Sequence, residues 1–488
     1  MLIGSTVRVR ALSSPTQRTL WNASRSSIIG RTTGGRITHP LLRVHSLAPP
    51  PPAAPAIAFA LARAFSSSAT ETASTAPKPA LFTTPLHNLH LAHNAKMVQF
   101  AGYSMPLMYP PQTHISEHNF TREHCSLFDV SHMVQHLFTG PGALAFLELL
   151  TPADLAKLSP HSSTLSVFLN PTGGIVDDSI ITMKAGRDQF YVVTNAGCRE
   201  KDLAYFAGAL QKWAAESASE KGQVVHHVLE GWGLIALQGP EAKSILAEWL
   251  LRDHVRTTDD LDKVLFGTSF EVSVPISDAA GERVTVHIAR GGYTGEDGFE
   301  ISIPPGVPGT DATTSITTKL LAIGGKSRIQ LAGLAARDSL RLEAGMCLYG
   351  HDLNEEITPA EASLSWVVHP RRRAEGAFLG ADIVTQQLRK GGTPPGRKRV
   401  GLDLGIGGPP AREGMKIFNG EGEEVGVVTS GGPAISLDMR NIAMGYVKRG
   451  VDKAGTRLAV DVRGKKREAQ VAKMPFVQTR YWKGQAGK

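Results

Sequence analysis

The sequence predicts a multidomain α+β protein, in which a mixed body of helices and strands precedes a small all-β barrel domain. Between residues 163 and 275, short β-branched segments alternate with helical ones, which is typical of an α+β body. Beyond residue 398 the segments are short alternating strands separated by Gly-containing turns, which indicates a barrel or sandwich. The 488 residues also exceed what one hydrophobic core usually serves, so we expect at least two domains.

The N-terminal segment has the composition of a targeting peptide. The first 70 residues contain eight Arg and ten Ser but no Asp, Glu or Lys, which is typical of a mitochondrial transit peptide. The run from Arg63 to Ser68 is similar to a matrix-processing site, so we expect residues 1–65 to be removed and residues 66–83 to form a flexible mature N-terminus. The alternative is a disordered basic arm that binds an acidic partner. We expect a mitochondrial matrix protein without a membrane segment, because the apolar run Ala56–Ala62 is too short to span a bilayer.

The basic isoelectric point of the whole chain is no evidence for nucleic-acid binding, because the excess of basic residues lies in the N-terminal segment. Of the 52 Lys and Arg residues, eight lie in the N-terminal segment, and the remaining 44 equal the 44 acidic residues in number. The C-terminal residues 440–488 nevertheless hold 13 basic and three acidic side chains. Such a basic region would attract an anionic ligand or partner. A solvated surface of mixed charge is the alternative.

Cofactor motifs of several common classes are missing from the sequence. Three widely spaced cysteines, Cys125, Cys198 and Cys347, fit neither a disulfide framework nor a CxxC metal site. The sequence has no GxGxxG fingerprint after an early strand, so we expect neither flavin nor nicotinamide. Lys326 and Ser327 end a segment like a P-loop, but Leu320 stands where the first Gly belongs. We therefore expect no metal and no phosphate loop.

The elements follow from hydrophobic periodicity in chain order. We expect the α+β body at 84–370, a linker rich in Arg, Gly and Pro at 371–397, and the barrel domain at 398–483. Within the body, the pattern predicts strands at Leu165–Leu169, Ile175–Ile181, Gln189–Thr194 and Trp232–Gln238, and helices at Gly140–Leu150, Cys198–Lys212 and Pro240–Leu250. A second strand-rich section at 269–303 leads to a predicted helix, Leu331–Met346, with Gly345 as its stop.

Two adjacent carboxylates follow a predicted hairpin turn. Pro171 and two glycines form the turn, so Asp177 and Asp178 lie early in its second strand. Successive strand residues point to opposite faces, so the two carboxylates cannot form a facing acid–base pair. One of them can face a pocket. Without a family resemblance, the sequence favours a simpler role for both residues, as hydrogen-bonding groups at the end of the turn.

Two further motifs carry charged side chains in regular positions. In the strand after GYTGEDG, Glu300 projects opposite the apolar Phe299 and Ile301, either into a pocket or into solvent. On the predicted helix, Arg337 and Arg341 share a face, as binding groups or as members of a surface salt-bridge ladder. In FDVSHM, residues 128–133, neighbouring Asp, Ser and His residues cannot supply the geometry of a catalytic triad.

Four stretches taken together resemble the aminomethyltransferase family, the T-proteins of the glycine cleavage system. They are FDVSHM at 128–133, NPTGGIVDDS at 170–179, GGYTGEDGFEI at 291–301 and GLAARDSLRLEAGMCLYG at 333–350. The resemblance extends from about residue 84 to residue 481. It implies a folate-binding aminomethyltransferase-like body with a C-terminal barrel. The implied reaction moves the aminomethyl carbon from the dihydrolipoyl arm of lipoylated H-protein to tetrahydrofolate, giving 5,10-methylenetetrahydrofolate and ammonia.

The resemblance also implies roles for individual residues. It makes Asp177 the catalytic carboxylate and Glu300 the carboxylate that binds the pterin. It implies folate contacts from Arg337, Tyr293, Met133, Asn195 and Tyr481, with Arg480 as a further contact to the folate tail. The expected partners are H-protein and other glycine cleavage proteins, with neither nucleic acid nor membrane.

Two relatives of this family remain as alternatives. A folate-dependent demethylase of the dimethylglycine or sarcosine dehydrogenase type would need a flavin domain, for which the chain has no room. A folate-binding scaffold for iron–sulfur assembly typically shows a KGCY-type motif, where this chain has EAGMCLYG at 343–350. The lack of room for a flavin domain and the absence of the KGCY-type motif both favour the transferase.

Overall fold

The computed structural model describes residues 80–253, 258–276, 281–306 and 310–484. The expected transit peptide at 1–65 and most of the expected flexible segment at 66–83 lie outside the described residues. Within the described part of the chain, none of the helices combines the length and the apolar character needed to span a bilayer.

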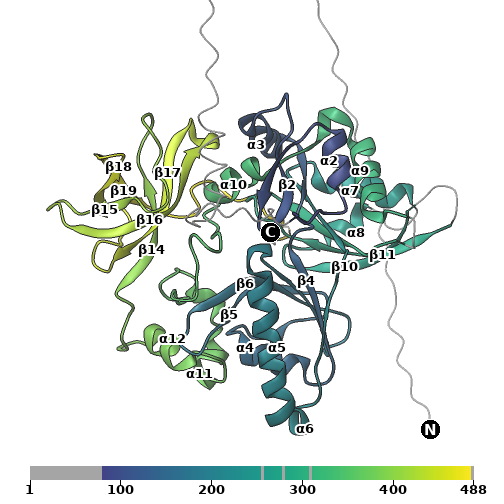
Figure 1. The fold of residues 1–488 in the computed structure, drawn as a ribbon, viewed down its shortest axis with the longest axis horizontal. Helices are drawn as coiled ribbons and strands as arrows, with labels where there is room; N and C mark the ends of the chain where they lie inside the picture. Colours follow the sequence, from purple (N-terminus) through teal and green to yellow (C-terminus); the bar gives the residue numbers. More distant parts are fainter. Residues whose placement is uncertain (1–79, 254–257, 277–280, 307–309, 485–488) are drawn as a thin grey trace, which may run out of the picture. The chain divides into compact units, whose positions relative to one another are not determined.

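A six-stranded sheet organises one part of the body, with the order β10-β11-β12-β9-β3-β13. Its strands β10 and β11 are labelled in Figure 1. Its strands are β3 (Cys125–Asp129), β9 (Gly233–Gln238), β10 (Ser269–Pro275), β11 (Arg283–Arg290), β12 (Gly298–Ile303) and β13 (Ile329–Leu331). Only the edge strand β13 runs parallel to its neighbour in this sheet. The accompanying helices are α2 (His87–Ala92), α3 (His114–Glu123), α7 (Ala242–Arg252), α8 (Thr258–Asp262), α9 (Ala312–Arg328) and α10 (Leu334–Glu343).

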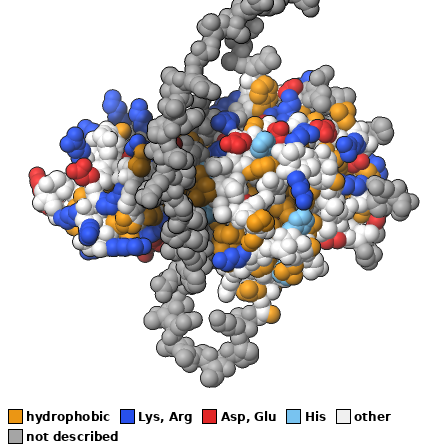
Figure 2. All heavy atoms as spheres, turned by 90° about the horizontal axis from the view of Figure 1, so that it is seen from above, with side chains coloured by type: hydrophobic (Ala, Val, Ile, Leu, Met, Phe, Trp, Pro, Cys, Tyr) orange, Lys and Arg blue, Asp and Glu red, His pale blue; other side chains and the backbone are white. Residues whose placement is uncertain are grey.

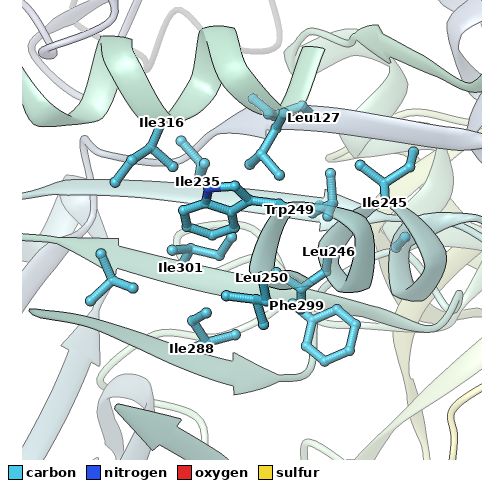
Figure 3. Packing of buried hydrophobic residues seen from close by; sticks show 14 of the residues in the cluster. Leu127, Ile235, Ile245, Leu246, Trp249, Leu250, Ile288, Phe299, Ile301 and Ile316 are labelled. Carbon is cyan, nitrogen blue, oxygen red and sulfur yellow. The ribbon is translucent and has the colours of Figure 1, made fainter. Parts of the chain in front are cut away.

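The core of this part lies between the sheet and the helices α7 and α9. Trp249 of α7 is almost fully buried against Ile235 of β9, Ile301 of β12 and Ile316 of α9 (Figure 3). Burial of a large aromatic side chain stabilises the fold by about 2–3 kcal/mol. This packing fixes β12 and β9, which carry residues of the site described below.

A five-stranded sheet organises the second part of the body, with the order β5-β6-β7-β4-β8. Its strands are β4 (Val134–Thr139), β5 (Ser163–Leu169), β6 (Ile175–Met183), β7 (Gln189–Thr194) and β8 (Val225–Val228). Its helical segments are α4 (Ala143–Leu150), η1 (Leu155–Lys157), η2 (Ala196–Cys198), α5 (Arg199–Glu216) and α6 (Ala218–Lys221). A separate ribbon pairs β1 (Lys96–Phe100) with β2 (Tyr103–Met108).

The C-terminal part is a closed barrel, as the sequence predicts. Its strands are β14 (Arg397–Asp403), β15 (Lys416–Phe418), β16 (Glu424–Ala434), β17 (Arg440–Lys448), β18 (Arg457–Val462) and β19 (Lys465–Ala472), with the short helix η4 (Ile435–Leu437). The barrel closes because β14 pairs with both β17 and β19. At Gly445, a Cβ atom would lie 2.5 Å from the carbonyl oxygen of Val427, so only glycine fits between these strands.

The segment expected to link body and barrel contains helices. Residues 371–397 contain most of α11 (Pro370–Glu375) and all of α12 (Ala381–Leu388), and η3 (Ser365–Val367) precedes them. Pro370 is favourable in the first turn of a helix, and His369 caps that turn by accepting the Arg371 N–H. Buried contacts of α12 with the body stabilise a helix that is too short to form alone.

The helix predicted at Leu331–Met346 is shorter in the structure. Leu331 ends β13, and α10 begins at Leu334 after Gly333. A Cβ atom on Gly333 would lie 2.3 Å from the carbonyl oxygen of Leu107, so this capping position requires glycine. Gly345 has a φ of +68°, which ends the helix as predicted.

Candidate functional site

A cavity of about 1660 Å³ is lined by residues from both sheets, from α10 and from the barrel. Asp178 comes from the five-stranded sheet, Glu300 from the six-stranded sheet, Arg337 from α10 and Val400 from the barrel. Such a volume accommodates a ligand larger than most drug-sized molecules.

Six of the seven predicted site residues line this cavity. They are Met133, Asn195, Tyr293, Glu300, Arg337 and Tyr481. The seventh, Asp177, does not line it, whereas its neighbour Asp178 does.

Asp177 lies behind the cavity wall. Its side chain is fully buried, and it accepts hydrogen bonds from the backbone N–H of Asn195 and from Asn195 Nδ2, both at 2.8 Å. The pleat of β6 turns adjacent residues to opposite faces, so Asp177 and Asp178 cannot both reach the cavity. The catalytic contact expected for Asp177 therefore does not fit its position, because of the two aspartates only Asp178 lines the cavity.

Asp178 is a carboxyl group that titrates near neutral pH. Burial raises its pKa to about 7, and the neighbouring charge of Asp177 adds to this increase. Asn195 Nδ2 donates to Asp178 Oδ1 at 2.9 Å and thereby connects the two aspartates. A carboxyl group with this pKa can exchange protons with a ligand at physiological pH.

Glu300 lies on β12, next to the middle of the six-stranded sheet. The residues directly opposite it are Ala289 on β11 and Ala236 on β9. Directly opposite residues share a face of the sheet, so these small side chains leave the carboxylate uncovered toward the cavity. Burial raises the pKa of Glu300, and the charge of Arg337 opposes this effect. Among the described residues, none is found to form a hydrogen bond with this carboxylate.

Arg337 and Arg341 share a face of α10 but have different roles. Arg341 forms ion pairs with Asp338 at 2.8 Å and with Asp352 at 2.9 Å, so it is a structural group. Arg337 stacks on Tyr293, with its guanidinium carbon 4.8 Å from the centre of the ring. Its buried Nη1 has no hydrogen-bond partner within the described part of the chain. A buried donor without a partner is costly, which indicates that a ligand satisfies it.

Tyr293 is held in place by a turn that requires glycine. A Cβ atom on Gly292 would lie 2.0 Å from Oε1 of the buried Gln238, so only glycine fits there. The Tyr293 hydroxyl donates to the carbonyl oxygen of Cys347. This hydrogen bond engages the hydroxyl at the edge of the ring, so the face of the Tyr293 ring can contact the Arg337 guanidinium.

Residues 128–133, the FDVSHM segment, supply part of the cavity wall, and their Asp, Ser and His residues do not form a catalytic triad. Asp129 accepts hydrogen bonds from Thr84 at 2.6 Å and pairs with His90 at 2.8 Å, so it is not the partner of His132. Burial lowers the pKa of His132 to about 4, so this imidazole is neutral at physiological pH. Met133 supplies apolar surface beside it.

The C-terminal segment returns to the body and brings Tyr481 to the cavity. The Tyr481 ring stacks on Phe266 at 4.3 Å between centroids, and its buried hydroxyl has no partner among the described residues. Arg480 instead binds the body, through the carbonyl oxygen of Arg122 at 2.9 Å and the carboxylate of Glu296 at 3.3 Å. Arg480 is not among the cavity-lining residues, so the contact expected from it does not fit its position.

Lys201 and Arg399 are among the cavity-lining cations that the sequence did not predict. Lys201, in the first turn of α5, lies over the Tyr349 ring at 4.2 Å from its centre. Arg399 of β14 is buried and donates to the carbonyl oxygen of Ala362 at 2.8 Å. Lys201 lies six residues after Asn195, so its position close to a predicted site residue could have indicated that it lies near the site. Nothing in the sequence around Arg399 could indicate that it lines the cavity, because the barrel forms this part of the wall only when it packs on the body.

Comparisons with known proteins agree with this architecture. The GCVT N-terminal domain matches residues 86–372, and the glycine cleavage T-protein C-terminal barrel domain matches residues 397–478. The mitochondrial aminomethyltransferase of Flaveria anomala is 46% identical over 400 residues, covering 82% of this chain and 90% of the relative. That of Saccharomyces cerevisiae is 45% identical over 405 residues, covering 82% of this chain and 95% of the relative.

A solved structure supports the same assignment. The glycine cleavage system aminomethyltransferase T from Bartonella henselae matches with a TM-score of 0.70 and 38% sequence identity, covering 83% of this chain and all of that one. The chain therefore belongs to the aminomethyltransferase family, the T-proteins of the glycine cleavage system.

Proposed function

We propose that the cavity is the site where an aminomethyl carbon passes from the dihydrolipoyl arm of H-protein to tetrahydrofolate, releasing ammonia. The products are 5,10-methylenetetrahydrofolate and the reduced arm. One observation carries this proposal beyond family membership. The cavity brings together an uncovered carboxylate at Glu300, an unsatisfied guanidinium at Arg337 and, at Asp178, a carboxyl group that titrates near neutral pH.

Glu300 and Arg337 would bind the folate. A carboxylate accepts two parallel N–H donors, as the amino and ring nitrogens of a pterin present them. The Arg337 guanidinium offers a donor to an acceptor on the same ligand, and its stacking on Tyr293 fixes its plane. Met133 and Tyr481 would supply apolar contact.

Asp178 would assist at the reacting nitrogens. The folate supplies the nitrogens that accept the carbon, and the protein supplies position and charge. An ionised Asp178 stabilises positive charge that develops on the transferred group, and its neutral form can donate a proton to the departing amine. Asn195 would hold the Asp178 carboxylate in place through its amide.

The partner and location follow from the family. We propose lipoylated H-protein as the donor of the carbon and the mitochondrial matrix as the site of action, because the relatives described above are named mitochondrial aminomethyltransferases. Figure 2 shows Lys and Arg side chains gathered on the barrel, at the left of the view. Three of the barrel's basic residues, Arg457, Arg463 and Lys465, are exposed and have no ion pair within the described part of the chain. They suit an anionic partner or a polyglutamate tail.

The test is ammonia release from aminomethyl-loaded H-protein, with and without tetrahydrofolate. We expect strong stimulation by the folate, because the acceptor removes the carbon as ammonia leaves. A chain that binds folate without any turnover would instead be a folate-binding scaffold or an enzyme for another one-carbon donor.

A further inference from the structure

Two buried carboxyl groups, Asp177 and Asp202, lie on the far side of Asp178 beside the thiol of Cys198, and of these three residues only Cys198 lines the cavity. One carboxylate oxygen each of Asp177 and Asp202, and the Sγ atom of Cys198, all lie within 4.8 Å of one another. Asp177 comes from β6, Cys198 from η2 and Asp202 from α5. The two carboxyl groups are 0% and 1% exposed, so water does not screen their repulsion.

Nothing found around this cluster balances two negative charges. The nearby cation, Lys201, directs its Nζ to the carbonyl oxygen of Val176 and to the hydroxyl of Tyr349. Within the described part of the chain, no ion pair is found for Asp177 or Asp202. The groups that favour the ionised form of Asp202 are its neighbour Asp177, the nearby charge of Lys201 and the Thr194 hydroxyl. Two ionised carboxylates in such surroundings are strongly disfavoured, and a proton held between them removes most of that penalty.

We propose that Asp177 and Asp202 share a single proton, and that Asp202 thereby acts as a positioning residue for Asp178. The shared proton leaves one negative charge on the pair, which suffices to hold the two donors of Asn195. The part of the proposal that concerns Asp178 rests on the proposed function, whereas the shared proton itself does not.

The hydrogen bonds show how the pair acts on the cavity. Asn195 gives its backbone N–H and one amide hydrogen to Asp177, and Nδ2 also lies 2.9 Å from Asp178 Oδ1. The orientation of this amide follows from the network, because its nitrogen faces acceptors on both sides. Asp202 thus stabilises Asp177, Asp177 fixes Asn195, and Asn195 orients the carboxylate that faces the ligand.

The pKa shifts point in the direction that a shared proton requires. Burial raises the pKa of Asp177 well above its usual range, and the charge of Asp202 raises it further. Burial also raises the pKa of Asp202, to about 6. Other titratable groups that influence or adjoin the pair are Asp178, Cys198, Lys201, Tyr205 and Tyr349.

Infrared difference spectroscopy of the whole protein tests the shared proton without any reference to activity. At about pH 8.5, where Asp178 with its pKa of about 7 is ionised, the wild-type protein should show a protonated carboxyl stretch that disappears in Asp202→Asn. The matched control, Asp178→Asn, should keep this band. A band that persists in Asp202→Asn would contradict the proposal. So would a wild-type protein that lacks the band and contains one tightly bound divalent metal ion per chain, since a cation would then balance the two charges.

The pH profile of kcat/KM tests the effect on Asp178. In Asp202→Asn the pair keeps a single negative charge, so the acid limb assigned to Asp178 should keep its position even if turnover falls. If both carboxylates were ionised in the wild-type protein, removing one charge this close would lower that limb by about one to two pH units, which would overturn the proposal.

A second variant separates positioning from packing. Asp202→Leu fills a similar volume but cannot donate a hydrogen bond to Asp177, whereas Asn can. We expect kcat to fall much further in Asp202→Leu than in Asp202→Asn, with folate affinity similar in both. Equal kcat values in the two variants would show that Asp202 only fills space. If the infrared result holds but both Asp202 variants keep the wild-type kcat, the shared proton stands and the role of Asp202 in positioning Asp178 is refuted, whereas the role of Asp178 itself is tested by Asp178→Asn.

Discussion

Replacing Glu300 with Gln should weaken folate binding and leave the stability of the protein almost unchanged. The substitution preserves the shape of the side chain but turns one of two acceptor oxygens into a donor. A hydrogen bond to a charged group contributes about 1.5–3 kcal/mol, and the new amide also faces a ligand donor. We expect a loss of about 2–3 kcal/mol of binding free energy, which corresponds to a roughly 30- to 150-fold higher Kd for tetrahydrofolate.

The stability of the Glu300→Gln variant should change little. Burial raises the pKa of Glu300, so keeping this carboxylate charged inside the folded protein costs free energy, and Gln removes that cost. The variant also removes the charge that favours ionised Arg337. These effects oppose each other, and we expect the free energy of unfolding to fall by no more than about 1 kcal/mol.

Isothermal titration calorimetry with tetrahydrofolate, combined with denaturant unfolding, measures both quantities. The matched control is Glu468→Gln, an exposed glutamate on strand β19, which should change neither. A Kd within about threefold of the wild-type value for Glu300→Gln would refute the assignment of Glu300 to the pterin. A large loss of stability would refute the argument that its carboxylate is held ready for a ligand.

Four further predictions concern the same site and the basic barrel. Asp178→Asn should retain folate binding and lose at least about 100-fold in kcat, since general acid–base assistance is removed; unchanged kcat in a stopped-flow assay would remove Asp178 from the mechanism. The pKa of Asp178 in the folded state is raised to about 7, so between about pH 4 and pH 7 the folded protein binds a proton that the unfolded chain has lost. The free energy of unfolding should therefore decrease as the pH rises through this range. Urea unfolding of Asp178→Asn should show a smaller decrease. Tyr481→Phe removes a buried hydroxyl that has no partner among the described residues, so thermal unfolding should be unaffected while folate affinity falls by about tenfold; equal affinity by fluorescence titration would show that this hydroxyl does not contact the ligand. Raising the ionic strength should increase the KM for H-protein and for polyglutamated folate, and salt-independent KM values would contradict attraction by the basic barrel.

The parts of the fold that depend on local pattern were predictable from sequence. The hairpin at β5 and β6, the helix α10 and the barrel strands each follow from hydrophobic period and turn residues. The other parts of the fold depend on tertiary contacts that the local sequence pattern does not show. The helix α12 forms because Ala381 and Val384 are buried against the body, which the Gly- and Pro-rich flanking sequence does not reveal.

The site shows the same division between local and tertiary information. Strand alternation correctly predicts that Asp177 and Asp178 face opposite sides of β6, but it cannot say which side faces the cavity. That choice depends on how the two sheets and the barrel pack together. The difference between Arg337 and Arg341 is also tertiary, because Asp352, which binds Arg341, lies beyond the end of the helix.

A single-turnover experiment tests the central claim most directly. H-protein carrying an isotopically labelled aminomethyl group is mixed with the protein and tetrahydrofolate, and labelled methylenetetrahydrofolate and ammonia are both quantified as they form. We expect the two products to appear together in equal amounts, and the formation of both to be slowed to the same extent in Asp178→Asn. Ammonia released without labelled methylenetetrahydrofolate would contradict transfer to the folate in this cavity.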